Sequence, residues 1–232
     1  MKTIGIIGGM SWESSATYYR LINQQVRAAR GATASAPIIL WSFDFSEIEA
    51  LQRTGDWAGL TARMIDAARR LEGAGAELLL IATNTMHKMA PEVQAAVGVP
   101  LLHIADPAGQ AARGAGFATV GLLGTRFVME QDFYRAALER HGLKVVVPGE
   151  GHRGAVHRII YEELVAGVVR EDSRAAYRAA IADLVAQGAE AVVLGCTEIM
   201  LLVGPDDSAV PLLDTTTLHA GAAADWAVNS GS

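Results

Sequence analysis

Cysteine is almost absent from this sequence. The 232 residues include only one, Cys196, so no disulfide can form within the chain and no cluster of thiolates can hold zinc. Long apolar runs are also missing, because none reaches the roughly 18 residues needed to cross a bilayer. The single thiol therefore has to be explained by packing or by chemistry, and no membrane partner is expected.

Charge is scarce as well, and basic residues are not concentrated anywhere. Charged residues make up 19% of the chain, and the net charge of −6 is spread along it, which argues against nucleic acid as a partner. A negative protein repels acidic ligands at long range, so a carboxylate ligand must be held by local donors. Because Met1–Gly5 lacks the flanks of a signal peptide and the cysteine is single, we expect a cytoplasmic protein.

What the sequence does have is a regular alternation of short apolar runs with longer amphipathic segments. The runs are rich in Ile, Val and Leu and predict strands buried on both faces: Ile4–Gly8, Ile38–Phe43, Leu78–Ala82, Leu101–Ile104, Val120–Leu123, Lys144–Val147, Ala191–Gly195 and Val210–Leu213. The segments between them predict helices, among them Trp57–Leu71, Pro91–Ala96, Met129–His141, Val156–Val165 and Ser173–Gln187. This alternation predicts an α/β protein with parallel sheets flanked by helices.

An internal repeat divides the chain. Three motifs recur in the same order at nearly one separation, which is 116 residues for the first and 113 for the second: Thr3–Gly8 as Thr119–Gly124, Gly75–Leu80 as Gly188–Val193, and Val99–Leu102 as Val210–Leu213. We infer two similar lobes related by internal pseudo-symmetry, over residues 1–105 and 106–214.

Each lobe contains a strand that ends in a polar cluster, and the repeat aligns the two clusters. Thr83-Asn84-Thr85 follows the strand in the first lobe and Cys196-Thr197-Glu198 follows it in the second, with Thr83 aligned to Cys196. Ligands of open parallel sheets bind outside the carboxyl ends of the strands. We therefore expect a site in the cleft between the lobes, with the two strand ends opposed.

The position of Cys196 leaves two interpretations open. A thiol between a strand and a short helix would lie near amide groups that lower its pKa and favour the thiolate. Alternatively, a free cysteine is usually a small buried hydrophobic residue. Glu198 also has two interpretations, because it could tune the thiol or be an exposed glutamate favoured by the helix dipole.

Four motifs together resemble the aspartate/glutamate racemase family over nearly the whole chain: IGIIGGMSWES from Ile4, TNTMH from Thr83, LGT from Leu123 and GCTE from Gly195. Met10–Ser14 and Thr125–Phe127 are similar to the bacterial branch that acts on acidic amino acids. The resemblance implies an isomerase without pyridoxal phosphate or another cofactor, in which two cysteines flank the substrate Cα. One thiolate removes the α-proton and the other thiol protonates the opposite face, each step contributing about 10²–10⁴-fold.

The resemblance also implies an assembly and a position for the C-terminal helix. A homodimer is expected from the family, and residues 215–232 are expected to pack back on the first lobe.

Thr83 departs from the family pattern, because relatives carry a cysteine before Asn-Thr. A threonine hydroxyl is too weak an acid to replace a thiolate near neutral pH, which leaves four alternatives. Cys196 alone could exchange the α-proton of one enantiomer, or a water bound at Thr83 could support slow racemisation. The chain could instead resemble the single-cysteine malonate decarboxylases, or be a vestigial carboxylate-binding protein. The rest of the pattern favours an acidic amino-acid racemase with impaired or unusual activity.

Several polar side chains that follow strand ends are candidates for binding the substrate carboxylate: Asn84, Thr85, Thr125 and Thr197. Helix capping is the alternative role for Asn and Thr, and the resemblance favours substrate contact for Asn84, Thr85 and Thr197. Met10, after two glycines, is expected to line the pocket.

In some relatives a basic pair holds the distal carboxylate of the substrate. By this resemblance, the equivalent positions fall near Gln52 and Val165. Neither is charged, and a solvated surface role is expected for Arg53 and Arg126, which weakens strict aspartate or glutamate specificity. Gln52 is expected to line the pocket. Gly5–Gly9 lacks the full dinucleotide-binding spacing, and His87 and His219 lack a metal-ligand spacing, so neither a nucleotide nor a metal is expected.

Overall fold

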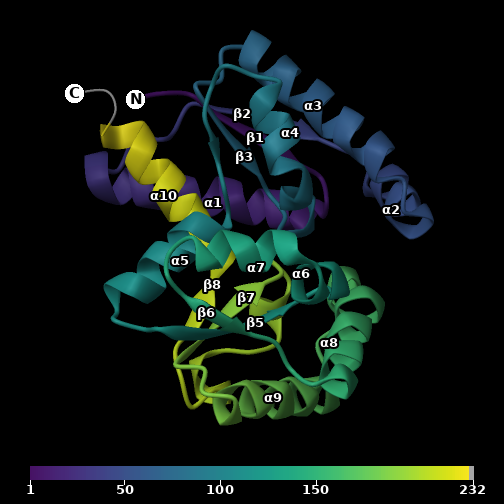
Figure 1. Ribbon diagram of the computed structural model, residues 1–232. Coiled ribbons are helices and arrows are strands. Elements are labelled where there is room, and N and C mark those ends of the chain that lie inside the picture. The colour runs from purple at the N-terminus through teal and green to yellow at the C-terminus, as the bar shows by residue number, and fades with distance from the viewer. Residues whose placement is uncertain (230–232) are drawn as a thin grey trace. The chain divides into compact units, whose positions relative to one another are not determined.

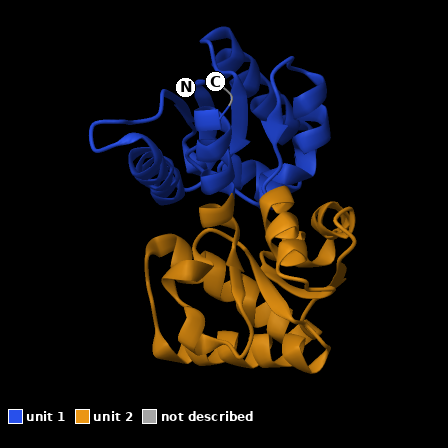
Figure 2. Ribbon diagram, turned by 90° about the vertical axis from the view of Figure 1, so that its left-hand side faces the viewer, with its two compact units in different colours: residues 1–104, 219–232 blue, residues 105–218 orange. Residues whose placement is uncertain are grey.

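The computed structural model describes residues 1–229 and divides into two compact α/β units (Figure 2). Unit 1 comprises Met1–Ile104 with the end of the chain from His219, and unit 2 comprises Ala105–Leu218. Each unit contains a parallel four-stranded sheet flanked by helices (Figure 1). The predicted fold class is confirmed.

In unit 1 the sheet has the strand order β2-β1-β3-β4. Its strands are β1 (Ile4–Gly8), β2 (Ile38–Ser42), β3 (Leu78–Ile81) and β4 (Leu101–Leu102). Its helical segments are α1 (Trp12–Arg30), α2 (Phe45–Thr54), α3 (Trp57–Gly73), the 3-10 helix η1 (Thr85–Met89), α4 (Ala90–Ala95) and most of α10 (Thr215–Asn229). The central strands β1 and β3 are buried along their whole length, as their apolar sequences predict.

Helices cover both faces of this sheet because successive side chains of a strand point to opposite sides. Ile4 and Ile6 of β1 pack in a cluster with α1 and α10, whereas Ile7 packs in a second cluster with α2, α3 and α4. Figure 1 shows α1 and α10 close together in this unit. The end of the chain thus completes one hydrophobic layer of unit 1.

In unit 2 the sheet has the strand order β6-β5-β7-β8. Its strands are β5 (Thr119–Gly124), β6 (Lys144–Val146), β7 (Ala191–Gly195) and β8 (Leu212–Asp214). Its helical segments are α5 (Ala105–Gly114), α6 (Arg126–Glu130), α7 (Asp132–Glu139), α8 (Glu150–Glu162), η2 (Leu164–Ala166), α9 (Glu171–Ala186), η3 (Ile199–Leu201) and η4 (Pro205–Asp207). Leu123 of β5 and Val192 of β7 face α8 and α9 in one buried cluster.

The two sheets repeat one another in order and in detail. β1 and β5 occupy the same place in their sheets, as do β3 and β7, which matches the sequence repeat. Even the glutamate of the repeated Gly-Ala-Glu motif has the same function. The Glu77 carboxylate accepts from the amide of Thr3 at 2.9 Å, and the Glu190 carboxylate accepts from the amides of Ala118 and Thr119 at 2.7 and 2.9 Å.

Two expected helices differ from the structure. The segment predicted as one helix over Met129–His141 is two helices, because Gln131 is extended (φ −97°, ψ 150°) and separates α6 from α7. The helix expected over Val156–Val165 begins earlier, at Glu150, and ends at Glu162 before η2. Helical periodicity persists across both breaks, so the apolar pattern does not mark them.

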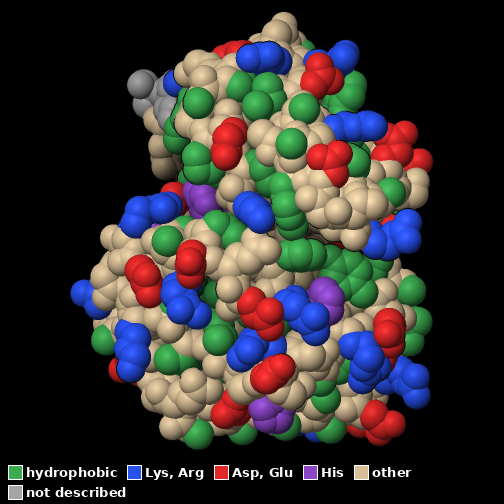
Figure 3. All heavy atoms as spheres, turned by 45° about the vertical axis from the view of Figure 1, so that its right-hand side comes forward, with side chains coloured by type: hydrophobic (Ala, Val, Ile, Leu, Met, Phe, Trp, Pro, Cys, Tyr) green, Lys and Arg blue, Asp and Glu red, His purple; other side chains and the backbone are tan. Residues whose placement is uncertain are grey.

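The surface carries charged side chains of both signs. Figure 3 shows acidic and basic side chains interspersed on the face in view. Within residues 1–229, no helix has both the length and the apolar character to cross a membrane.

Candidate active site

Cys196 lies at the carboxyl end of β7, a central strand of unit 2. The last residue of β7, Gly195, pairs with Gly124 of β5, and a Cβ at Gly195 would lie only 3.0 Å from the carbonyl oxygen of Leu123. The absence of a side chain at Gly195 allows this close approach. Cys196 itself is 7% exposed and belongs to the buried cluster between the sheet and α8 and α9. The sulfur is therefore held at a fixed strand end and is largely removed from solvent.

The Glu198 carboxylate binds this thiol. Sγ of Cys196 donates to Oε2 of Glu198 at 3.1 Å, and Oγ1 of Thr197 donates to the same oxygen at 2.7 Å. Glu198 is 9% exposed. The interpretation of Glu198 as an exposed glutamate is wrong, because its carboxylate is buried against the thiol and the hydroxyl.

The expectation that the pKa of Cys196 is lowered is also wrong. Burial raises the pKa of the Cys196 thiol well above its usual value, and the negative charge of Glu198 raises it further. The amides of Glu198 and Ile199 do act in the opposite direction, but they are outweighed. Only the three-residue η3 follows Cys196, so no long helix contributes a dipole. In the resting protein Cys196 is a thiol.

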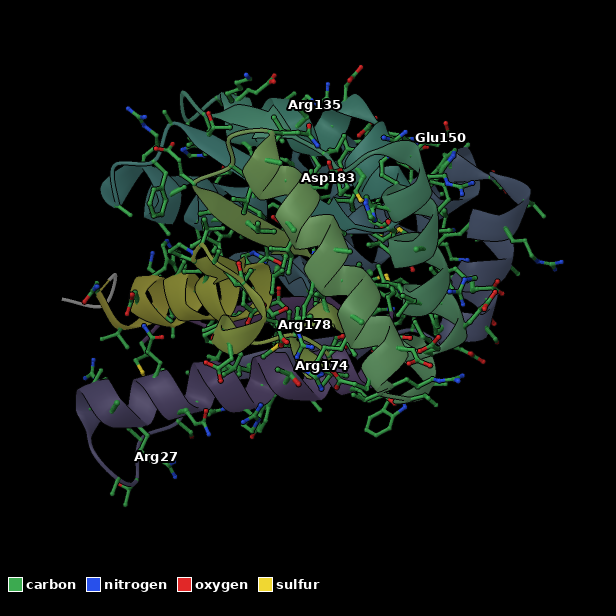
Figure 4. All side chains as sticks on the ribbon, turned by 90° about the horizontal axis from the view of Figure 1, so that it is seen from below. Arg27, Arg135, Glu150, Arg174, Arg178 and Asp183 are labelled. Carbon is green, nitrogen blue, oxygen red and sulfur yellow. The ribbon has the colours of Figure 1, made fainter. Side chains whose placement is uncertain are left out.

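Ion pairs from α9 anchor the segment that follows Cys196. Arg174 and Arg178 lie one turn apart on α9 (Figure 4) and bind the Asp207 carboxylate at 3.3 and 2.7 Å. Arg174 also donates to the carbonyl oxygen of Leu202. The amide of Gly204 and these two guanidinium groups hold the pKa of Asp207 below its usual value. The chain from η3 to η4 is thus tied to α9 by charged hydrogen bonds.

Thr83 has the corresponding place in unit 1. The amide of Ala82 still donates to Ile7 of β1 at 2.9 Å, and Thr83, the next residue, is half-buried. Asn84 and Thr85 follow and are 2% and 5% exposed. Asn84 precedes η1, yet its side chain makes no capping hydrogen bond to that helix. Helix capping therefore does not explain why a buried asparagine follows Thr83.

His87 fixes the backbone of this strand end. Its Nδ1 lies 2.8 Å from the carbonyl oxygen of Thr83, and its Nε2 accepts from the amide of Ile104 at 3.1 Å. Because Nε2 is an acceptor, the ring proton lies on Nδ1 and is donated to Thr83. Burial, followed by the neighbouring His219, lowers the pKa of His87 to about 3. His87 is therefore a neutral brace between Thr83 and the segment after β4.

A second buried histidine extends the brace to two helices of unit 1. Nδ1 of His219 on α10 accepts from the hydroxyl of Tyr18 on α1 at 2.8 Å, and its Nε2 donates to the carbonyl oxygen of Leu102 at 2.9 Å. Burial lowers the pKa of His219 to about 3 as well. The histidine rings of residues 87 and 219 are 5.8 Å apart. No sequence pattern indicates the bond between Tyr18 and His219, because the two residues are 201 positions apart.

The other predicted site residues have different surroundings. Thr125 caps α6, with Oγ1 accepting from the amide of Val128 at 3.4 Å, so the capping role applies to it. Met10 follows Gly9, is 6% exposed, and packs in the cluster with α2 and α3. Gln52 lies on α2, where its Oε1 atom is buried and has no hydrogen-bond partner among residues 1–229.

The described residues therefore form two local constellations at equivalent strand ends. In unit 2 these are Cys196, Thr197, Glu198 and Thr125, and in unit 1 they are Thr83, Asn84, Thr85 and His87. Within residues 1–229, no group of three or more histidine, cysteine, aspartate or glutamate side chains is arranged to hold a metal ion. The site contains a buried thiol beside a carboxylate. Such a pair can remove a proton from a carbon acid and return it.

Comparison with known proteins shows similarity to racemases. Residues 7–223 match the family model described as Asp/Glu/hydantoin racemase. A crystal structure from Yersinia pestis, assigned as an Asp/Glu racemase, is 53% identical with a TM-score of 0.93, covering 99% of this chain and 100% of that one. A crystal structure of an aspartate racemase homologue from Pyrococcus horikoshii is 35% identical with a TM-score of 0.85, at the same coverages.

A curated relative is more distant. The broad specificity amino-acid racemase RacX of Bacillus subtilis is 23% identical over 164 residues, which are 66% of this chain and 66% of RacX. The chain thus matches about two thirds of the length of that relative.

Proposed function

We propose that this chain, which belongs to the Asp/Glu/hydantoin racemase family, is an amino-acid racemase that needs no cofactor and uses Cys196 as the acid and base at the substrate Cα. The aspartate/glutamate type is favoured because the Yersinia pestis and Pyrococcus horikoshii relatives carry those names. The observation that carries the proposal is a single thiol at the carboxyl end of β7, in a family of racemases.

The reaction is a proton exchange at carbon. The Cys196 thiolate takes the α-proton, so the C–H bond breaks, an S–H bond forms, and the electron pair stays on the substrate as a carbanion. Returning the proton from the same thiol regenerates the original enantiomer, whereas inversion needs a proton from the other face. Thr83 takes the place where the resemblance implies a second thiol, and a water bound there would supply that proton slowly.

Local donors are proposed to hold the substrate carboxylate. Asn84, Thr85, Thr125 and Thr197 follow strand ends, where amides and hydroxyls are available to carboxylate oxygens. Gln52 and Met10 are proposed to line the pocket, and the buried Oε1 of Gln52 is an acceptor that suits a hydrogen-bond donor on the substrate rather than a carboxylate. Because a glutamine replaces a charged residue there, the preference for a distal carboxylate should be weaker than in relatives with a basic pair.

Assembly and location stay predictions. A homodimer is inferred from the resemblance and a cytoplasmic location from the single cysteine. Sedimentation of the purified chain would test the first.

The test is deuterium exchange in heavy water. The chain and its Thr83→Cys variant are incubated with D- and L-aspartate and with D- and L-glutamate, and deuterium at Cα is followed by NMR while enantiomers are separated by chiral chromatography. We expect α-deuterium to enter one enantiomer only in the unmodified chain. The Thr83→Cys variant should invert the substrate, because it restores a proton donor on the second face. Cys196→Ser should abolish exchange in the unmodified background, whereas in the Thr83→Cys background the remaining thiol should exchange only the opposite enantiomer.

The alternatives give different results. Loss of carbon dioxide from a malonate, with protonation of the enolate by Cys196, would replace the racemase by a lyase. No exchange in either the unmodified chain or the Thr83→Cys variant would favour a carboxylate-binding protein without turnover.

A further inference from the structure

Two donors, a thiol and a hydroxyl, meet at one buried carboxylate oxygen in unit 2. Both the thiol of Cys196 and the hydroxyl of Thr197 donate to Oε2 of Glu198, at 3.1 and 2.7 Å. The three residues are between 7% and 9% exposed. A carboxylate in such a place is costly unless hydrogen bonds stabilise it, and here it receives one from the proposed catalytic thiol.

A buried tyrosine interacts with this carboxylate and with a second one. Tyr177 of α9 is fully buried, and besides burial, its pKa is raised by the negative charges of Glu198 and Glu163. Glu163, before η2, is 8% exposed and accepts from the hydroxyl of Ser173 at 2.5 Å. A second negative charge on Cys196 would therefore add to charge that is already buried, and losing the thiol proton to bulk water is disfavoured.

We infer that Glu198 is the proton acceptor of Cys196, so that the pair keeps one proton and one negative charge while the thiolate forms. This inference rests on the proposed function, because it gives a role to Glu198 only if Cys196 acts as the base. When the S–H bond breaks, an O–H bond forms on Glu198, and the pair keeps a single negative charge during this transfer, so burial does not oppose it as it opposes deprotonation to water. The thiolate then takes the α-proton, which leaves the pair neutral with two protons and places the negative charge on the substrate carbanion.

Thr197 is the positioning residue of the pair. Its hydroxyl donates to Oε2, the same oxygen that receives the thiol. This bond stabilises the carboxylate and fixes its direction towards Sγ. The hydroxyl proton of Thr197 is thus directed to Glu198, and its proposed contact with the substrate carboxylate is made by its amide.

The experiment measures the thiol and the exchange reaction separately. Because the chain has one cysteine, the rate of alkylation by iodoacetamide as a function of pH, followed by mass spectrometry, reports Cys196 alone. In Glu198→Gln the like charge is gone, and the midpoint of alkylation should fall by at least about one pH unit. The exchange rate constant of the favoured enantiomer at saturating substrate should nevertheless fall at least about 100-fold, with KM little changed, because the proton acceptor is lost.

Two further variants test the same pair of groups. Thr197→Val removes a donor from the same carboxylate, so the midpoint of alkylation should rise, opposite to Glu198→Gln. Glu198→Asp keeps the charge, so its midpoint should stay nearer to that of the unmodified chain and its exchange rate should exceed that of Glu198→Gln. Circular dichroism checks that each variant is folded, and the Thr197→Val shift tests the pair even if Glu198→Gln does not fold.

The outcomes distinguish this inference from the proposed function. If Glu198→Gln exchanges the α-proton at nearly the unmodified rate, or if its alkylation midpoint does not fall, Glu198 is not the acceptor and the racemase proposal stands. If Cys196→Ser exchanges as fast as the unmodified chain, the thiol is not the base and both proposals fail.

Discussion

At the scale of single residues, the turn after β1 depends on the absence of a side chain. Gly9 has φ +82°, and a Cβ there would lie 2.3 Å from both the amide nitrogen and the carbonyl oxygen of Phe43. The amide of Gly9 also donates to the hydroxyl oxygen of Ser15 at 2.8 Å. The turn that carries Met10 therefore has backbone on one side and α1 on the other, and neither can move away cheaply.

Gly9→Ala should consequently be strongly destabilising. The left-handed conformation alone costs roughly 1–2 kcal/mol for a residue with a Cβ, and the clash with the backbone of residue 43 should bring the loss to about 3 kcal/mol or more. Gly55→Ala is the matched control, since Gly55 has φ +71° but open space around its Cβ position. Urea unfolding followed by tryptophan fluorescence measures both. Equal losses in the two variants would show that the contact with Phe43 adds nothing.

At the scale of elements, most of what defines the fold is visible in the sequence. The repeated Gly-Ala-Glu motif could be read as two equivalent strands because a left-handed glycine, at φ +97° in Gly75 and +92° in Gly188, precedes each of them. The candidate strand ends at Thr83 and Cys196 follow from the same repeat. By contrast, the break at Gln131 has neither a glycine nor a proline to mark it, and the sequence did not indicate it.

The site was less predictable than the strands, because its electrostatics depend on burial. The side chain of Glu198 could be counted as exposed or as a partner of the thiol until its contacts were known, and the direction of the Cys196 pKa depended on that answer. For His87 the sequence indicates only that it has no metal-ligand spacing with His219. Its bond to Thr83 is local, four residues away, whereas its bond to Ile104 reaches the segment after β4.

The repeated glutamates allow a prediction about the two sheets. Two amides donate to Glu190 and lower its pKa, with the amide of Thr119 as the larger cause and that of Ala118 as the second. The Glu77 carboxylate, by contrast, accepts from one amide. Glu190→Ala leaves two strand-start amides without their acceptor and should lower the urea midpoint more than Glu77→Ala. Far-UV circular dichroism of the two variants compares them. A larger effect of Glu77→Ala would contradict this ranking.

At the scale of the whole molecule, the end of the chain stabilises unit 1 through an uncharged network. Alanines of α10 pack against Ile4 and Ile6 of β1, and His219 joins Tyr18 to Leu102. The neutral rings of His87 and His219 lie in this interior, so protonating either ring would place an unfavourable positive charge there. The fold of unit 1 should therefore be sensitive to acid.

The sign of that sensitivity follows from the two lowered pKa values. Both histidines have a folded pKa of about 3, below the ordinary 6.5, so the unfolded chain binds protons more readily. Their contribution to stability is complete above about pH 6.5 and is lost as the pH falls towards 3, by up to about 1.4 kcal/mol per histidine for each pH unit. All four tryptophans belong to unit 1, so tryptophan fluorescence in urea between pH 7 and 4 follows this unit. In His219→Gln, whose amide can still donate to Leu102, the dependence on pH should be about half as steep, because one titrating group remains. An unchanged slope would mean that His219 takes up its proton without opening the interior of unit 1.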